Sequence, residues 1–140
     1  MNVMIDTNII IDSIAARQPF NRDAEQIMLL AAGRKLKASI TASTVTDIYY
    51  LCKKRLGDAN QAKEILQKLF TIIEITSVDK NDCIKALAAV MDDYEDAVLA
   101  VCAKRMKADY IITRNLKDFS NSPVEPISPS DFLSRFFPEI

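Results

Sequence analysis

The sequence predicts a three-layer α/β/α domain, in which a central, mostly parallel sheet of four to five strands lies between helices. Short apolar runs alternate with segments of amphipathic helical pattern, and connections of helical length are typical of parallel strands. Glycine occurs only twice in 140 residues, too rarely for a turn-rich all-β fold. The length suits one domain, so we expect residues 1–140 to form a single unit.

Five short apolar runs are the expected strands: residues 2–5, 36–40, 72–75, 110–112 and 124–127. Pro123 and Pro126 flank the last run, and proline cannot donate to a strand ladder, so we expect this strand at an edge of the sheet.

Apolar residues at helical spacing predict helices between these runs. The expected helices cover residues 21–33, 44–56, 58–70, 79–91, 95–107 and 128–137. Asp79 and Ser128 are the expected N-caps of two of them, with Pro129 at a first helical position. Gly33 and Gly57 each follow a helical pattern, and we expect both to end a helix in the left-handed conformation.

Composition excludes several classes of protein. The net charge of −1 provides no global positive field, so any nucleic-acid binding must depend on local patches. Cys52, Cys83 and Cys102 lie in helical patterns without metal-ligand spacing, and we interpret them as buried apolar residues of a reducing compartment. No apolar run has the length of a signal-peptide core or a membrane span, which predicts a cytoplasmic protein without membrane contact.

Acidic residues occur where a parallel sheet would bring them together. The carboxyl ends of its strands meet at one edge, where ligands bind, and helix starts can lie at the same edge. The candidates at such positions are Asp6, Asp47, Asp93, Asp96, Asn115 and Asp118. Because the chain has no histidine, any chemistry falls to carboxylates, which favour Mg²⁺ or Mn²⁺. Clustered carboxylates repel one another unless cations lie between them, and such ions can activate water against a phosphodiester.

Several of these acids also have a purely structural interpretation. Asp47 could close a capping box with Thr44 near the start of the helix predicted for residues 44–56. Asp93 could be an ordinary N-cap with Asp96 in its first turn, and Asp118 could be a loop acid.

Asp6 is harder to explain by structure alone, because a charge at the end of a buried strand is costly without a partner. It could cap a helix over residues 7–15 and still bind a metal ion. We interpret Asp92 and Glu95 as solvated surface acids.

Three segments of the sequence resemble parts of a known family. Asp6-Thr7-Asn8, directly after the first apolar run, and residues 96–103 and 111–119 resemble the opening, the third-acid helix and the fourth-acid segment of the PIN-domain family of nucleases. The resemblance spans nearly the whole chain. It implies a sheet with helices on both sides, an acidic pocket and RNA cleavage that depends on Mg²⁺ or Mn²⁺. Many small bacterial members, the VapC-like group, are toxins of toxin–antitoxin pairs and are commonly dimeric.

Two positions depart from the family pattern. Asp47 stands where the family usually has glutamate, and Asn115 stands where it often has aspartate. Asn115 can bind a metal through its carbonyl oxygen but adds no charge, which leaves Asp118 as the candidate to supply it. Asp93 matches an acid found in some relatives only.

The sequence therefore predicts a metal-dependent endoribonuclease, the toxin of a toxin–antitoxin pair. The expected catalytic acids are Asp6, Asp47, Asp93 and Asp96, and the expected ligands of Mg²⁺ or Mn²⁺ are Asp6, Asp96, Asn115 and Asp118. Arg114 and Lys117 flank the fourth-acid segment and are the expected phosphate contacts. Lys53, Lys54 and Arg55 suit the end of a helix dipole, and we expect them away from the pocket.

The expected partners are an RNA substrate, a cognate antitoxin and a second copy of the chain. The alternative function is a PIN-like domain that has lost catalysis and binds protein or RNA. A phosphohydrolase acting on small molecules ranks last, because residue 8 is asparagine and no Asp-x-Asp pair follows the first strand.

Overall fold

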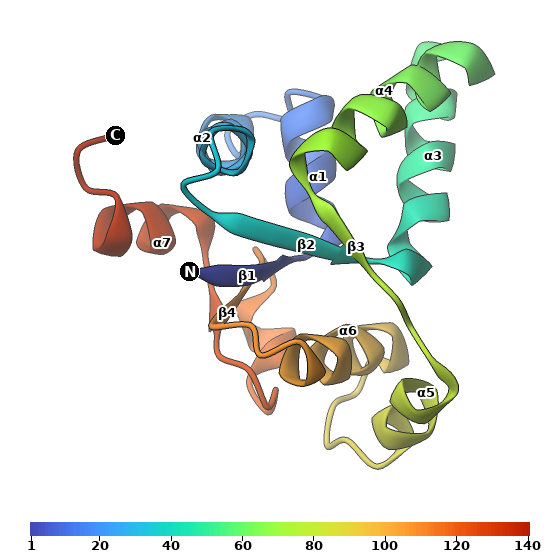
Figure 1. The fold of residues 1–140 in the computed structure, drawn as a ribbon, viewed down its shortest axis with the longest axis vertical. Coiled ribbons are helices and arrows are strands. Elements are labelled where there is room, and N and C mark those ends of the chain that lie inside the picture. Colours follow the sequence, from blue (N-terminus) through green and yellow to red (C-terminus); the bar gives the residue numbers. More distant parts are fainter.

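The computed structural model describes all 140 residues and contains a five-stranded parallel sheet between two layers of helices (Figure 1). The strand order is β3-β2-β1-β4-β5. The strands are β1 (Asn2–Ile5), β2 (Lys37–Thr41), β3 (Glu74–Thr76), β4 (Tyr110–Ile112) and β5 (Pro126–Ile127). The helices are α1 (Thr7–Ile14), α2 (Asn21–Ala32), α3 (Ala42–Leu56), α4 (Ala59–Ile72), α5 (Lys80–Leu87), α6 (Tyr94–Arg105), α7 (Pro129–Phe136) and the short 3₁₀ helix η1 (Leu116–Phe119).

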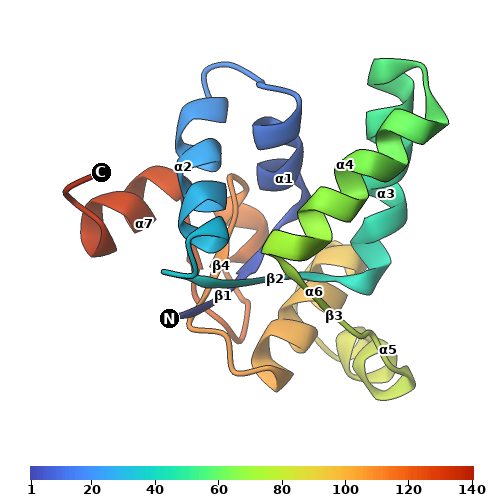
Figure 2. The ribbon, with the colours of Figure 1, turned by 45° about the horizontal axis from the view of Figure 1, so that its top comes forward.

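The helices divide between the two faces of the sheet. Helices α1, α2, α3 and α4 cover one face, while α5 and α6 cover the other, and α7 lies beside α2 (Figures 1 and 2). This arrangement confirms the predicted three-layer α/β/α fold with a parallel sheet. None of the helices combines the length and the hydropathy that a membrane span requires.

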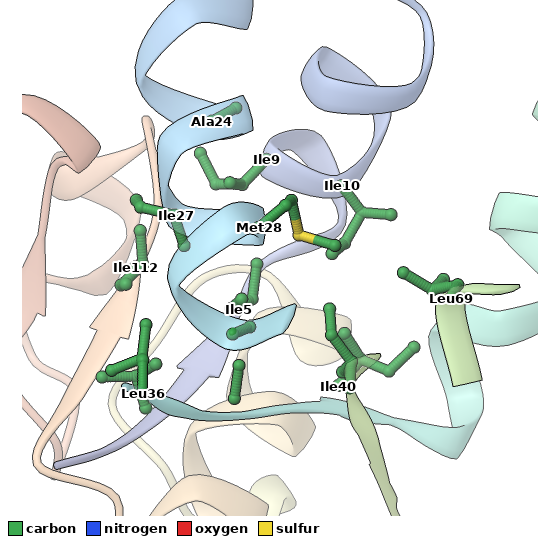
Figure 3. Close-up of a cluster of buried hydrophobic side chains, with 14 of the residues drawn as sticks. Ile5, Ile9, Ile10, Ala24, Ile27, Met28, Leu36, Ile40, Leu69 and Ile112 are labelled. Atoms are coloured by element: carbon green, nitrogen blue, oxygen red, sulfur yellow. The ribbon is translucent and has the colours of Figure 1, made fainter. Parts of the chain in front are cut away.

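The central strand β1 contributes to a separate core on each face of the sheet. Val3 and Ile5 point into the larger core, where Figure 3 shows Ile5 close to Ile9 of α1 and Ile27 of α2. Met4 points the other way, into the smaller core against α6. All three strand residues are fully buried, which stabilises the fold by about 1.5–3 kcal/mol for each such side chain. Burial on both faces explains the uninterrupted apolar run at the start of the sequence.

Several element boundaries differ from the prediction. Helix α3 begins at Ala42, directly after β2, and not at residue 44. The strand predicted for residues 72–75 lies at Glu74–Thr76, because Ile72 still belongs to α4. The last strand shortens to Pro126–Ile127 and lies at the predicted edge.

Two helix ends also differ from the prediction. Helix α5 stops at Leu87, because the amides of Ala88 and Ala89 bond to carbonyls three residues back and close the last turn. Helix α6 ends at Arg105, before the predicted residue 107. Met106 caps it, and its amide still bonds to the Cys102 carbonyl.

Helix α5 does not bury its cysteine. Its buried residues are Asp82 and Ala86, whereas Cys83 is exposed, contrary to the prediction that all three cysteines are buried. The cause is an ion pair across the α5–α6 contact, in which Arg105 Nη2 lies 2.9 Å from Asp82 Oδ2. This pair lowers the pKa of Asp82 to about 2 and directs Asp82 inward.

Only one of the two glycines has the expected backbone conformation. Gly57 ends α3 with φ +70°, in the left-handed region. Gly33 has φ −79°, and the left-handed residue after α2 is Arg34, with φ 57°. The amide of Lys35 then bonds to the Leu30 carbonyl at 3.0 Å, so the turn closes one residue later than predicted.

The two glycines should therefore respond differently to substitution by alanine. Gly57→Ala places a Cβ in open space but in the left-handed region, so we expect a loss of about 1–2 kcal/mol in the free energy of unfolding. Gly33→Ala meets its nearest neighbour, the Leu29 carbonyl oxygen, at an ordinary 3.4 Å and restricts the unfolded chain, so we expect a gain of about 0.4–1 kcal/mol. Urea unfolding measures both, and equal losses would contradict this account.

Candidate active site

A pocket of about 540 Å³ lies at the carboxyl edge of the sheet, the right-hand edge in Figure 1. It is formed where β1 and β4 end and where α3 and α6 begin. Five of its lining residues are acids: Asp6, Asp47, Asp93, Glu95 and Asp96. The structure thus brings together the four acids that the sequence singled out before residue 115, along with a fifth that was interpreted as solvated surface.

Asp6 is buried at the bottom of this pocket and has a fixed orientation. It follows β1 directly and is the N-cap of α1, so its Oδ1 accepts a hydrogen bond of 2.8 Å from the Thr7 amide. Its Oδ2 accepts from the Thr113 hydroxyl at 2.8 Å and from Asn8 Nδ2 at 3.3 Å. The capping and the site interpretations of Asp6 are therefore compatible.

The start of α6 supplies two more acids. Asp93 is its N-cap, and its Oδ1 accepts a 3.0 Å hydrogen bond from the Asp96 amide. Asp93 Oδ2 makes no hydrogen bond within the protein and is available to a ligand in the pocket that Asp93 lines. Asp96, in the first turn of the helix, is only partly exposed. The predicted capping role of Asp93 is real, but it uses only one carboxylate oxygen.

Asp47 occupies a different helix position from the predicted one. Because α3 begins at Ala42, Asp47 falls in its second turn, and no capping box with Thr44 forms. The Thr44 hydroxyl instead donates to the Thr41 carbonyl at 2.9 Å. With the capping interpretation excluded, Asp47 has no structural role in α3, and it lies close enough to Glu95 to affect its ionisation.

The segment after β4 forms the last wall of the pocket. Asn115 lines it, and the Asn115 amide donates to Thr113 Oγ1 at 3.0 Å. Asp118 belongs to the 3₁₀ helix η1 and is exposed outside the pocket lining, near enough to act electrostatically on Asp6 and Asp96. The two candidates for the fourth position thus differ, since Asn115 offers an oxygen at the wall and Asp118 adds negative charge to the pocket.

The electrostatics of the pocket favour a bound cation. Burial raises the pKa of Asp96 to about 7, and repulsion from Asp93, Asp6, Asp118 and Glu95 contributes to the shift. Burial also raises the pKa of Asp6, although the hydrogen bonds from Thr113 and Thr7 oppose this. The pKa of Glu95 is raised by burial and by Asp47. Burial is the first cause of each shift, and negative neighbours add to it, so the ionised carboxylates are disfavoured unless a cation is present.

The family model of the PIN domain matches residues 2–117, most of the chain. This chain belongs to the PIN-domain family. The match covers Asp6, Asp47, Asp93, Asp96 and Asn115 and ends just before Asp118. No curated protein matches the sequence.

Solved structures share the fold of this PIN domain at low sequence identity. A chain of a toxin–antitoxin complex from Klebsiella pneumoniae has a TM-score of 0.69 and 21% identity, with 91% of this chain and 97% of that one covered. A chain of VapBC2 from Rickettsia felis, bound to a promoter DNA fragment, has a TM-score of 0.64 and 18% identity over 91% and 98%. VapC20 from Mycobacterium tuberculosis, a toxin that cleaves the sarcin-ricin loop, has a TM-score of 0.60 and 16% identity over 78% and 86%.

The donor groups of this PIN domain fit a hard divalent cation. Mg²⁺ and Mn²⁺ prefer carboxylate and amide oxygens, and these are the groups that the pocket presents. Asn8 Oδ1 is buried beside Asp6 with no hydrogen-bond partner, as expected of an oxygen that binds an ion or its water. In this arrangement no three acidic side chains are close enough to hold a metal by themselves. Mg²⁺ commonly keeps several of its waters, and such a water can link the ion to an acid that does not reach it directly.

The predicted phosphate contacts have different surroundings. Arg114 binds the buried Asp12 through Nε at 2.6 Å and Nη2 at 3.2 Å, and its guanidinium lies 3.9 Å from the centre of the Phe20 ring. Lys117 is exposed on η1 and makes no side-chain contact with an acid. A role of either residue in binding RNA stays a prediction.

Sequence reasoning missed four contributors to this site. Glu95 is exposed, as expected for a surface acid, but it also lines the pocket, which was not predicted. Thr113 and Asn8 were unassigned, although both adjoin residues already singled out. Arg17 lines the pocket from a loop that carries no motif, and no periodic signal in the sequence could place it there.

Proposed function

We propose that this PIN domain is an endoribonuclease that depends on Mg²⁺ or Mn²⁺ and serves as the toxin of a toxin–antitoxin pair. The observation that carries the proposal is the convergence of five acids in one pocket where burial and mutual repulsion raise the pKa of Asp96 to about 7. Family membership and the shared fold with toxin–antitoxin chains support the same conclusion.

The residues of this chain take distinct roles in the proposed site. Asp6 and Asp96 hold the metal, with Asn115 as a neutral oxygen donor and Asp118 as an additional negative charge. Asp47 and Asp93 complete the catalytic acids. When bound, the metal ion supplies an activated water and stabilises charge on the scissile phosphate.

Several contacts prepare these groups before any ligand binds. Thr113 and Thr7 fix both oxygens of the Asp6 carboxylate, so little reorganisation is needed. Arg114 and Lys117, adjoining the pocket wall, are proposed to contact the RNA backbone. No histidine or cysteine nucleophile takes part.

The proposed partners are a cognate antitoxin and a second copy of the chain. Antitoxin binding is supported by the toxin–antitoxin complexes that share this fold. Dimerisation is supported by exposed apolar side chains on α5 and in the turn after it, where Ile84, Leu87 and Val90 face solvent.

The direct test is cleavage of single-stranded RNA by the purified protein with Mn²⁺ or Mg²⁺. We expect Asp6→Asn to lower the rate at least about 100-fold, because it removes a charge from the bottom of the pocket and keeps the size of the side chain. Chelation of the metal should have the same effect. Asp92→Asn is the matched control, since Asp92 is exposed and outside the pocket, and it should cleave like wild type.

The alternative function is a PIN-like module without catalysis, which the short Asp47 side chain and the neutral Asn115 favour. Equal cleavage by wild type and Asp6→Asn would show that the activity is not that of this site. A wild-type protein that cleaves no RNA and gains no thermal stability from Mn²⁺ would favour the binding module.

A further inference from the structure

A second hollow adjoins the acidic pocket and has the opposite charge. It has a volume of about 430 Å³, and its lining residues come from α1, the turn after α1, α3 and α4. Figure 2 shows these helices on the same side of the sheet. Its lining includes Arg17, Lys54 and Arg55 but no carboxylate, and most of the rest is apolar. We call it the basic groove. It shares Ile11, Arg17 and Leu51 with the acidic pocket, so the two hollows are adjacent.

Arg17 is the cation at the junction, and the fold holds it there. Its Nε donates to Oδ1 of the buried Asp12 at 3.0 Å, while its side chain stays 41% exposed. Its two Nη atoms make no hydrogen bond within the protein and remain free for a ligand. Among the residues that line the acidic pocket, Arg17 alone carries a positive charge.

A left-handed residue before Arg17 turns the chain back towards the end of α1. Ala16 has φ 50°, in the left-handed region that costs a residue with a Cβ about 1–2 kcal/mol. This turn lets the Arg17 amide donate to the Asp12 carbonyl at 3.1 Å, as in the Schellman ending of a helix. Asp12 therefore binds Arg17 through both its backbone and its side chain.

The other two cations come from the last turn of α3. Arg55 Nη2 donates to the Ala15 carbonyl at 3.2 Å, which ties the end of α3 to the loop that carries Arg17. Lys54 makes no ion pair and lines the groove beside it. Lys54 and Arg55 were expected away from the acidic pocket. They lie at the end of α3, and the basic groove that they line adjoins the acidic pocket.

We propose that Arg17, Lys54 and Arg55 bind the phosphates of the RNA strand next to the phosphate in the acidic pocket. This inference rests on the proposed function, because it names the path of that substrate. A strand with its scissile phosphate among the acids must leave along a surface that does not repel it, and the basic groove offers one. Cations that neutralise successive phosphates let a protein follow a strand without reading its sequence.

The test is the salt dependence of RNA binding by the full chain, with chelator present so that no cleavage occurs. A short fluorescent single-stranded RNA reports binding by anisotropy. The variants are Arg17→Gln, Lys54→Gln and the double variant. The control is Lys104→Gln, at the end of α6 on the opposite face of the sheet.

We expect each groove variant to weaken binding severalfold at low salt and the double variant to weaken it further. The slope of log affinity against log salt should become shallower by about 0.7 for each phosphate that the variant no longer neutralises. The control should keep the wild-type slope. Arg17→Gln leaves Asp12 paired with Arg114, and Lys54 is exposed and unpaired, so both variants should fold, which thermal melting verifies.

Three outcomes separate this inference from its rivals. An unchanged affinity and slope in the double variant, with wild-type cleavage intact, would overturn the basic groove and leave the proposed function standing. An unchanged slope for RNA together with weaker binding of poly-glutamate would assign the groove to an acidic peptide and also overturn it. Shallower slopes in a protein that cleaves no RNA would support the groove and reject the nuclease.

Discussion

Replacing Asp96 with asparagine is expected to stabilise the metal-free protein at pH 8 and to abolish its response to Mn²⁺. The pKa of Asp96 is raised from 3.8 to about 7, chiefly by burial and then by the negative charges of Asp93, Asp6, Asp118 and Glu95. Its position in the first turn of α6 favours the ionised form by only about 0.3–1 kcal/mol. The whole shift corresponds to about 4 kcal/mol, so burial and repulsion dominate.

The pH dependence follows from the direction of this shift. A folded-state pKa above the unfolded value means that folding favours the protonated carboxyl. The stabilisation is complete below about pH 4 and is lost as the pH rises through 7. The asparagine amide carries no charge at any pH, so the advantage of Asp96→Asn grows from pH 5 to pH 8. Because water at the pocket mouth screens part of the repulsion, we expect a gain of about 2 kcal/mol.

Thermal unfolding at several pH values, with chelator or with Mn²⁺, measures both effects. Wild type should gain stability from Mn²⁺ by linkage, more at pH 8 than at pH 6, because the ion competes with the proton on Asp96. Asp92→Asn, in the exposed loop before α6, should match wild type under all conditions. A Mn²⁺ response in Asp96→Asn as large as that of wild type would remove Asp96 from the metal site.

The fold was predictable because its signals are local and mutually consistent. The first apolar run is buried on both faces as β1, and periodic apolar residues place most of the helices within a few residues. The errors occur where tertiary contacts override the local pattern. Helix α5 turns Asp82 inward because Arg105 reaches it from α6, a partner distant in sequence that no periodicity reveals.

The candidate site was predictable for a different reason. Acids at the ends of strands and starts of helices converge because a parallel sheet gathers those positions at one edge. The same rule cannot say which face of a helix an acid takes, so it did not predict that the exposed Glu95 also lines the pocket, and it left a capping box as an alternative for Asp47. The basic groove could not be predicted from the sequence. Arg17 comes from a loop, and its partner Asp12 interrupts a run of isoleucines without belonging to any motif.

Substitution of both Arg17 and Arg114 by glutamine is expected to lower the free energy of unfolding by about 3–5 kcal/mol. Both guanidinium groups bind Asp12, whose side chain is 0% exposed, with Nε distances of 3.0 Å for Arg17 and 2.6 Å for Arg114. The double variant leaves a buried carboxylate without any cation. Either single variant leaves one cation in place, so each should cost much less than half of the double loss.

This non-additivity distinguishes a shared buried charge from two independent surface pairs. Urea unfolding of the two single variants and the double variant gives the coupling energy. Adding Asp12→Asn to the double variant should recover part of the lost stability, because the orphaned charge is removed. Strictly additive single losses, or no recovery, would contradict the account. Since Arg114 directly precedes Asn115, the same charge also ties the pocket wall to α1, so the double variant should lose Mn²⁺ binding along with its stability.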